Sequence, residues 1–193
     1  MEASEWIYRG LYRDQYRALG ELPIGPPEWT WQDRYDLWVA AGYRPGMSIL
    51  DYGCGWGIIL NAIEDWSTYL GVDICPEVIE LGRSKFPGAD FRVLDDLGTL
   101  DCGVKDFVVA HSVFTHTPRE LVAATLQNIK RALGGIGLVD IIEGRDNPEE
   151  WLIRKYREDE WLERLRLAGL QANKLKEAPR CGYPMIYYKV THA

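Results

Sequence analysis

The sequence predicts a doubly wound α/β fold, in which a mainly parallel sheet carries helices on both faces. Three observations support this fold class. From residue 47 onward, short apolar runs alternate with amphipathic segments; prolines mark helix starts and glycines mark helix ends; and a glycine cluster separates the first strand pattern from the helical pattern after it. Strand–helix–strand units of this kind join parallel strands by right-handed crossovers.

The composition is that of an ordinary globular domain. The chain has 193 residues, of which 47% are hydrophobic and 26% charged, a balance that excludes wholesale disorder and a coiled coil. No run of 18 apolar residues is present, and the N-terminus lacks a basic patch followed by an apolar run. We therefore expect no membrane partner, no secretory signal and a cytoplasmic location.

The net charge and the cysteine spacing restrict the classes of binding partner that we expect. The 22 basic and 29 acidic residues give a net charge of −7, which disfavours general nucleic-acid binding. The four cysteines are widely spaced and form no C-x-x-C pair, so we expect reduced thiols and no metal site. A small-molecule substrate and a monomer or homodimer fit this profile.

Residues 1–46 are predicted to form an N-terminal helical cap on a catalytic domain of residues 47–193. A first helix spans residues 5–19 and a second spans residues 32–41. Three tyrosines recur every four residues on the first helix and so share a face: Tyr8, Tyr12 and Tyr16. This stripe either packs the helix onto the sheet or forms a lid that offers a hydroxyl to the site.

The catalytic domain is predicted to contain seven strands. Apolar or alternating patterns place them at residues 48–52, 68–73, 91–94, 107–110, 136–142, 171–177 and 185–190. Helices are expected at residues 56–66, 76–86, from the capping box Thr117-Pro118-Arg119-Glu120 to residue 133, and over a long stretch between residues 147 and 169. The last two strands follow each other without a helix, so we expect them to be antiparallel.

The strongest chemical signal is the segment Asp51-Tyr52-Gly53-Cys54-Gly55-Trp56-Gly57, between a strand and a helix pattern. Its glycines allow a tight turn and a close approach of backbone to a ligand. A dinucleotide fingerprint would need glycine at position 58, which is Ile58. The acid at Asp51 would repel a pyrophosphate and favours a ligand with a cationic group.

With these features the sequence resembles the class I S-adenosylmethionine (SAM)-dependent methyltransferases of the small-molecule type. The resemblance runs from about Met47 to Val190. Residues 49–57 are similar to the family's first motif, residues 71–74 to its second, residues 95–97 to its third, and residues 107–117 to the segment around its fourth strand. It implies a Rossmann-like, seven-stranded sheet whose last strand is antiparallel, and SAM as cofactor.

The resemblance also implies a role for each cofactor-binding residue. Gly53, Cys54, Gly55 and Gly57 would lay backbone against the methionine portion of SAM, and Asp51 would hold its ammonium. Asp73 would accept hydrogen bonds from the ribose hydroxyls. Ile74 and Leu97 would sandwich the adenine, with Asp96, or less favourably Asp95, accepting from its amino group. The backbone at His111 and Ser112 would face the methionine end and the acceptor.

Simpler structural interpretations stay open for several of these residues. The glycine loop could be a turn alone, Asp73 could cap the helix that starts at Pro76, and Asp95 and Asp96 could be turn residues. Cys54 is predicted to be a small loop residue rather than a nucleophile, because no histidine neighbours it in the sequence.

Three residues are candidates for catalysis. His111 ends the fourth strand, His116 follows near the next helix, and Tyr12 belongs to the tyrosine stripe. His116 could equally cap the helix or pack. After the fifth strand, Glu143, Trp151 and Tyr156 could line another wall or could equally belong to a solvated helix. Methyl transfer is an in-line displacement on an activated carbon, so alignment is essential while a general base is needed only for some acceptors.

The predicted function is methyl transfer from SAM to an oxygen, nitrogen or carbon atom of a small molecule. Residues 110–113 do not form the N-P-P-Y type of tetrapeptide that would suggest base methylation of nucleic acid. Two alternatives stay open: non-methyl SAM chemistry, such as cyclisation of its aminobutyrate arm, and a catalytically inactive SAM-binding partner protein. A nucleotide-dependent oxidoreductase is the least favoured class.

Overall fold

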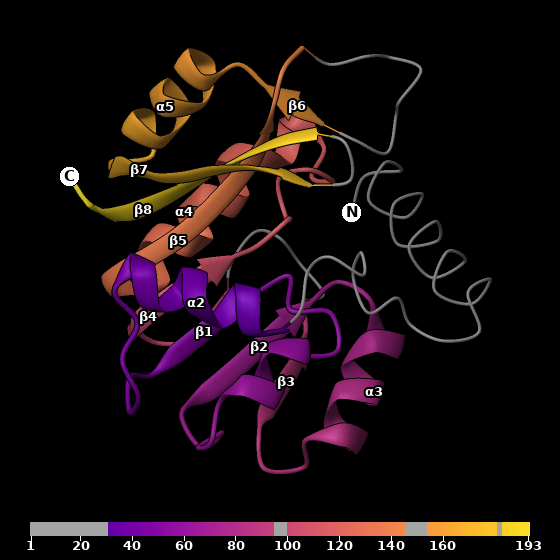
Figure 1. Ribbon diagram of the computed structural model, residues 1–193. Helices are drawn as coiled ribbons and strands as arrows, with labels where there is room; N and C mark the ends of the chain where they lie inside the picture. Colours follow the sequence, from indigo (N-terminus) through magenta and orange to yellow (C-terminus); the bar gives the residue numbers. More distant parts are fainter. Residues whose placement is uncertain (1–30, 95–99, 146–153, 181–182) are drawn as a thin grey trace.

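One mixed sheet organises the part of the chain that the computed structural model describes, residues 31–94, 100–145, 154–180 and 183–193 (Figure 1). Its strands run in the order β3-β2-β1-β4-β5-β8-β7, and a short strand, β6, pairs with β5. The strands are β1 (Ile49–Tyr52), β2 (Tyr69–Asp73), β3 (Asp90–Val93), β4 (Lys105–Ala110), β5 (Leu133–Glu143), β6 (Lys155–Tyr156), β7 (Leu170–Arg180) and β8 (Tyr183–His192).

The strand directions confirm the doubly wound class. The pairs among β1 to β6 are parallel, and β8 runs antiparallel to both β5 and β7. The central strands are buried on both faces, as in the segment Phe107-Val108-Val109-Ala110, and parallel sheets covered by helices require such apolar runs. The predicted seven-stranded path is therefore correct, with β6 as an eighth, two-residue addition.

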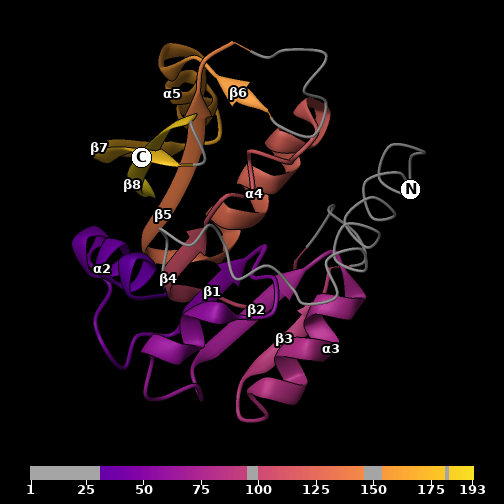
Figure 2. The same ribbon diagram turned by 45° about the vertical axis from the view of Figure 1, so that its right-hand side comes forward.

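Helices cover both faces of the sheet (Figures 1 and 2). On one face lie α2 (Trp31–Ala41), the short 3-10 helix η1 (Ile58–Ala62) and α3 (Pro76–Lys85), which bury residues such as Trp38, Leu60 and Ile79. On the other face lie α4 (Val122–Ala132) and α5 (Glu158–Leu167), which bury Leu126 and Trp161. The apolar residues recur every three or four positions, so each helix presents one stripe to the sheet.

The helix predicted over residues 56–66 is wrong. Only η1 forms there, after Gly57 in the left-handed region at φ +75°. Side chains satisfy carbonyls that a longer helix would have used: Asn61 Nδ2 donates to the Ile58 oxygen, and Trp66 Nε1 donates to the Ile63 oxygen at 2.7 Å. These bonds stabilise a tight turn, because the carbonyl groups no longer depend on helical amides for hydrogen bonds.

Two more helix predictions need correction. Thr117 does not cap a helix, because its Oγ1 donates to the Val113 oxygen at 2.9 Å; a 3-10 turn, η2 (Arg119–Leu121), precedes α4 instead. The long helix expected between residues 147 and 169 is represented by β6 and α5 in its described part. Among the described residues, no helix is long and apolar enough to cross a membrane.

Candidate active site

The site lies at the edge of the sheet where the parallel strands end, and the glycine loop after β1 forms its floor. Gly53, Gly55 and Gly57 have φ values of +75°, +56° and +75°, a region that side chains disfavour. The Gly53 and Cys54 amides both donate to the Val72 oxygen, at 2.7 and 3.0 Å. The loop therefore folds back over β2 and keeps its backbone exposed to a ligand.

Gly55 is the point of the loop where a ligand has room. A Cβ built on Gly55 meets no atom of the described residues within 4 Å, whereas one built on Gly53 would lie 2.5 Å from Val113 Cγ2. Among the described residues, Gly55 therefore has open space beside it, while Gly53 touches the loop after β4. An extended ligand can lie against the backbone at Gly55.

Asp51 supplies a buried negative charge directly before the loop. The residue is 7% exposed, and the Tyr69 hydroxyl donates to its Oδ2 at 2.9 Å. Burial raises the pKa of Asp51 to about 6, opposed by the Tyr69 hydrogen bond and the charge of Arg34. A neighbouring cation, such as the ammonium of SAM would provide, stabilises the charged form of a carboxylate held in this way.

Asp73 ties the end of β2 to the glycine loop. Its Oδ2 accepts the Gly55 amide at 2.9 Å and its Oδ1 accepts the Cys75 amide at 3.0 Å. Burial raises the pKa of Asp73 and these backbone bonds oppose the rise. The interpretation of Asp73 as a residue that shapes the start of α3 thus has support, and each oxygen still has lone-pair capacity for a ribose hydroxyl.

Cys54 stands between Gly53 and Gly55 in the loop. The side chain is buried, and burial together with the charges of Asp51 and Asp73 raises its pKa well above the usual value. A reactive cysteine needs a lowered pKa and a positive surrounding. Cys54 therefore serves the loop by packing, as the sequence predicted.

A histidine just after β4 lies beside an aspartate of β5 and a tyrosine of β8, and sequence reasoning identified only the histidine. His111 directly follows β4, and its Nδ1 lies 2.8 Å from Asp140 Oδ2 in β5. Asp140 pairs in register with Tyr187 of β8, whose ring stacks on the His111 ring at 5.8 Å. The second carboxylate oxygen of Asp140 accepts the Ser112 amide at 2.8 Å.

The loop after β4 is held against the rest of the site. Ser112 has φ +60°, a conformation that costs energy in a residue other than glycine. The Val113 oxygen accepts the His116 amide at 3.0 Å, and the Thr115 oxygen accepts the Arg154 amide at 2.7 Å. His116 is half-buried, and the tight turn fixes the position of its backbone.

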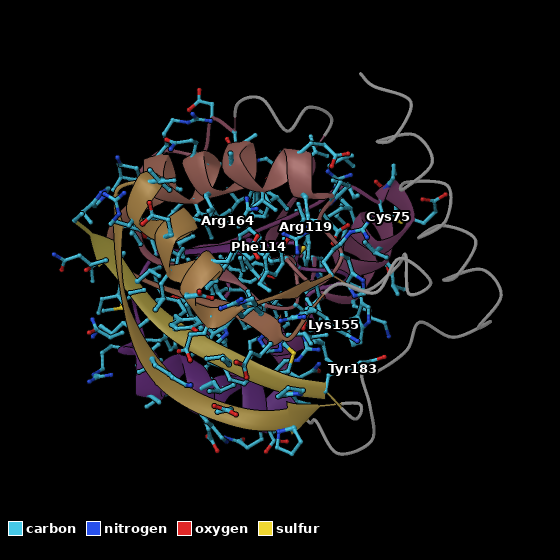
Figure 3. The ribbon with its side chains drawn as sticks, turned by 90° about the horizontal axis from the view of Figure 1, so that it is seen from above. Cys75, Phe114, Arg119, Lys155, Arg164 and Tyr183 are labelled. Atoms are coloured by element: carbon cyan, nitrogen blue, oxygen red, sulfur yellow. The ribbon has the colours of Figure 1, made fainter. Side chains whose placement is uncertain are left out.

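Aromatic and basic side chains form a wall beside this loop (Figure 3). Phe114 packs edge-on against Trp161 at 4.6 Å. Arg119 lies over the Tyr156 ring at 4.8 Å. Lys155 lies over the Tyr183 ring at 4.7 Å, and Figure 3 shows these two side by side. Of the predicted wall, Tyr156 is fully buried and stabilises it from within, while Trp151 lies outside the described residues.

The structure brings most of the predicted cofactor residues to one edge. The glycine loop, Asp51, Asp73 and the half-buried Ile74 gather at the ends of β1 and β2, and His111 and Ser112 at the end of β4. His192 instead lies at the opposite edge, where Nε2 is 2.5 Å from the Leu133 oxygen. The tyrosine stripe and the third motif lie outside the described part of the chain, as Trp151 does: Tyr8, Tyr12, Tyr16, Asp95, Asp96 and Leu97.

Sequence reasoning missed Asp140 and Tyr69. Both stand in strands among apolar neighbours, Asp140 in the run Leu138-Val139-Asp140-Ile141-Ile142 and Tyr69 at the start of β2. A lone acid in a strand that is buried on both faces needs a buried partner, and that signal could have identified Asp140.

Comparisons with known proteins agree with this geometry. Residues 49–137 match the family described as "Methyltransferase domain". The ribosomal protein L11 methyltransferase of Burkholderia ambifaria (strain MC40-6) is 32% identical over 108 residues, which are 54% of this chain and 35% of the relative. The chain thus spans about a third of the length of the curated relatives it matches.

Solved structures share the fold. A TehB-like SAM-dependent methyltransferase from Corynebacterium glutamicum has a TM-score of 0.65 at 24% identity, with 99% of each chain covered. The magnesium protoporphyrin IX methyltransferase of Synechocystis with bound SAM has a TM-score of 0.67 at 18% identity, covering 84% of this chain and 78% of that one. Together with the glycine loop and the strand order, these findings show that the chain has the Rossmann-like fold of the solved SAM-dependent methyltransferases and that residues 49–137 match a methyltransferase domain.

Proposed function

We propose that the protein transfers the methyl group of SAM to a small-molecule acceptor. The observation that carries this proposal is the cradle at Gly55, which no other described residue fills, while the Gly55 amide is fixed by Asp73. Bound SAM supplies a methyl group on a positively charged sulfur, which an acceptor atom can attack in line.

The residues at the edge have distinct tasks in this proposal. Asp51 holds the ammonium of SAM, and the glycine loop lies along its methionine portion. Asp73 accepts from the ribose hydroxyls, and Ile74 provides apolar surface for the adenine. Leu97 completes that surface, with Asp96 or Asp95 accepting from the adenine amino group; these three belong to the proposal through the family resemblance alone.

The small-molecule acceptor is supported by charge and by the site's lining. The net charge of −7 gives no general attraction for nucleic acid. Phe114 and Tyr156 are fully buried and support this edge from within, while the half-buried Tyr183 ring beside Lys155 offers the kind of aromatic surface that small-molecule sites use.

A protein acceptor is a second candidate. The likeness to ribosomal protein L11 methyltransferases favours it, at 32% identity over 108 residues. That likeness covers 54% of this chain, so it applies to about half of the fold. The experiment below tests which acceptor is methylated.

The test has two stages. Isothermal titration calorimetry with SAM and with S-adenosylhomocysteine comes first, and we expect both to bind. Methyl-tritiated SAM is then incubated with a panel of phenols, alcohols, amines and carboxylic acids, and separately with ribosomal protein L11. Label on a small molecule supports the proposal, and label on L11 alone supports the second candidate.

Three further outcomes would overturn both candidate functions. A SAM-derived product formed without any acceptor, seen by mass spectrometry, would indicate cyclisation of the aminobutyrate arm. Tight SAM binding with no product under any condition would indicate an inactive partner protein. Absence of SAM binding would refute the assignment of the cradle itself.

A further inference from the structure

We propose that Asp140 holds His111 as the proton acceptor for a substrate that reacts through a hydroxyl group. This inference rests on the proposed methyl transfer and adds to it a base, a positioning residue and a class of acceptor. The observation behind it is the row formed by His111, Asp140 and Tyr187 across β4, β5 and β8.

Burial makes the His111–Asp140 contact specific. The His111 side chain is 7% exposed and that of Asp140 is 0% exposed, with 2.8 Å between Nδ1 and Oδ2. Within the described part of the chain, Asp140 Oδ2 accepts no hydrogen bond of good geometry, and His111 Nδ1 lies within ion-pair distance of it. A buried carboxylate oxygen requires a donor, so the ring proton stays on Nδ1. The basic nitrogen of the neutral ring is then Nε2.

Asp140 also fixes the backbone from which His111 projects. Its Oδ1 accepts the Ser112 amide, and Ser112 is held at φ +60°. One carboxylate thus sets both the tautomer of the ring and the turn that follows it. The Tyr187 ring, nearly parallel to the imidazole at 13°, limits the ring's rotation.

The place of His111 is next to the cofactor cradle. β1 and β4 are neighbours, with Asp51 opposite Val109, two residues before His111. On the far side of the turn, a Cβ on Gly53 would collide with Val113. The loop that carries His111 is therefore in contact with the loop that would carry the methionine portion of SAM.

The proton balance of the step points to a hydroxyl. As the hydroxyl oxygen bonds the methyl carbon, the carbon–sulfur bond breaks and its electron pair stays on sulfur. His111 Nε2 takes the hydroxyl proton, so the positive charge lost from sulfur appears on the imidazole, beside the Asp140 carboxylate. Water later removes that proton. A thiol ionises readily without such a base, and an ammonium would bring a second cation toward the sulfonium.

The first experiment reads the tautomer and needs no SAM. The chain has three histidines, so long-range proton–nitrogen NMR on histidine-labelled protein at pH 8 is simple, and His111→Asn assigns the ring. We expect the proton on Nδ1 in the wild type. In Asp140→Asn, the side-chain oxygen can still accept from Ser112 while its amide donates to Nδ1, so the proton should move to Nε2.

The second experiment measures methylation of the hydroxyl compounds that the acceptor panel identifies. Asp140→Asn and His111→Asn should lower the rate by about 10²- to 10⁴-fold and leave SAM affinity within about twofold. Added imidazole should restore part of the rate in His111→Ala. Asp106→Asn is the matched control, since Asp106 accepts from Ser48 at the opposite edge of the sheet, and its rate should stay at the wild-type level.

The outcomes separate the two proposals. A wild-type ring with its proton on Nε2, or a tautomer unchanged in Asp140→Asn, overturns the pairing whatever the activity. Methylation of thiols or amines alone, no acceptor despite bound SAM, or hydroxyl methylation unaffected in His111→Asn overturns the role as base. If SAM does not bind while the tautomer responds to Asp140→Asn, the proposed function has failed and the pairing stands.

Discussion

Replacing Asp51 with asparagine should stabilise the free protein while weakening its hold on SAM. Asp51 is 7% exposed, and burial raises its pKa from 3.8 to about 6. The folded state therefore binds a proton more tightly than the unfolded state does. Stability consequently falls as the pH rises from about 4 to about 6, and it stays reduced at higher pH.

The size of the effect can be worked from the pKa shift. A rise of about 2 pKa units at about 1.4 kcal/mol per unit corresponds to roughly 3 kcal/mol that the charged carboxylate costs the folded state. The asparagine oxygen can still accept the Tyr69 hydroxyl that donates to Asp51. We expect Asp51→Asn to gain about 1–3 kcal/mol in unfolding free energy at pH 8 and nothing at pH 4.

The same substitution should lower SAM affinity, although it raises stability. The ammonium of SAM gains from the carboxylate, so Asp51→Asn should weaken SAM binding by about 1.5–3 kcal/mol, or roughly 10- to 100-fold. In the wild type, SAM affinity should fall as the pH drops through about 6, because Asp51 becomes protonated. In Asp51→Asn, this dependence on pH should be lost.

Urea unfolding at pH 4, 6 and 8 and calorimetry with SAM at pH 6 and 8 measure both effects. Asp106→Asn is the control of opposite sign: bonds from Ser48 lower the pKa of Asp106, so its loss should reduce stability at pH 8 and leave SAM affinity unchanged. The reasoning is refuted if Asp51→Asn is less stable than the wild type at pH 8, or if it binds SAM equally well.

Three other predictions concern the cradle and its rim. Asp73→Asn should weaken SAM binding by about 1–3 kcal/mol, and unchanged affinity in calorimetry would place the ribose elsewhere. Gly53→Ala should lower the unfolding free energy in urea by about 2–4 kcal/mol, because the left-handed φ of Gly53 and its contact with Val113 both disfavour a Cβ. Gly55→Ala should lower the unfolding free energy by only about 1–2 kcal/mol but should weaken SAM binding. Equal losses of stability in the two variants would contradict the open space at Gly55. His116→Ala should leave SAM affinity unchanged in the same calorimetry and should lower turnover only if its ring reaches the acceptor.

The sequence predicted the fold where local chemistry and tertiary packing agree. The helix at Pro76 forms as expected because proline suits its first turn and one face is apolar. The segment after Gly57 has a helical pattern too, but Trp66 and Asn61 take the carbonyls instead. Helix length at this point depends on side-chain hydrogen bonds, which periodicity does not record.

The candidate site also contains residues that the sequence predicts and residues that it does not. The glycine loop and Asp73 are predictable because their spacing is local, and the structure brings them together at one edge. The partnership of His111 with Asp140 depends on the register of β4 against β5, 29 positions apart in the chain, and on the stacking of Tyr187. Strand register arises from the assembled sheet, so the identity of such a partner emerges only with the fold.

In the proposed function, the contact between Gly53 and Val113 joins the loop that would bind the methyl donor directly to the loop that would face the acceptor. A larger residue at position 113, chosen by evolution or by an engineer to suit a new acceptor, would push on the backbone beneath the donor. Changes of acceptor preference in this scaffold should therefore arise at positions further along the rim, and the Gly53–Val113 contact should tolerate little variation.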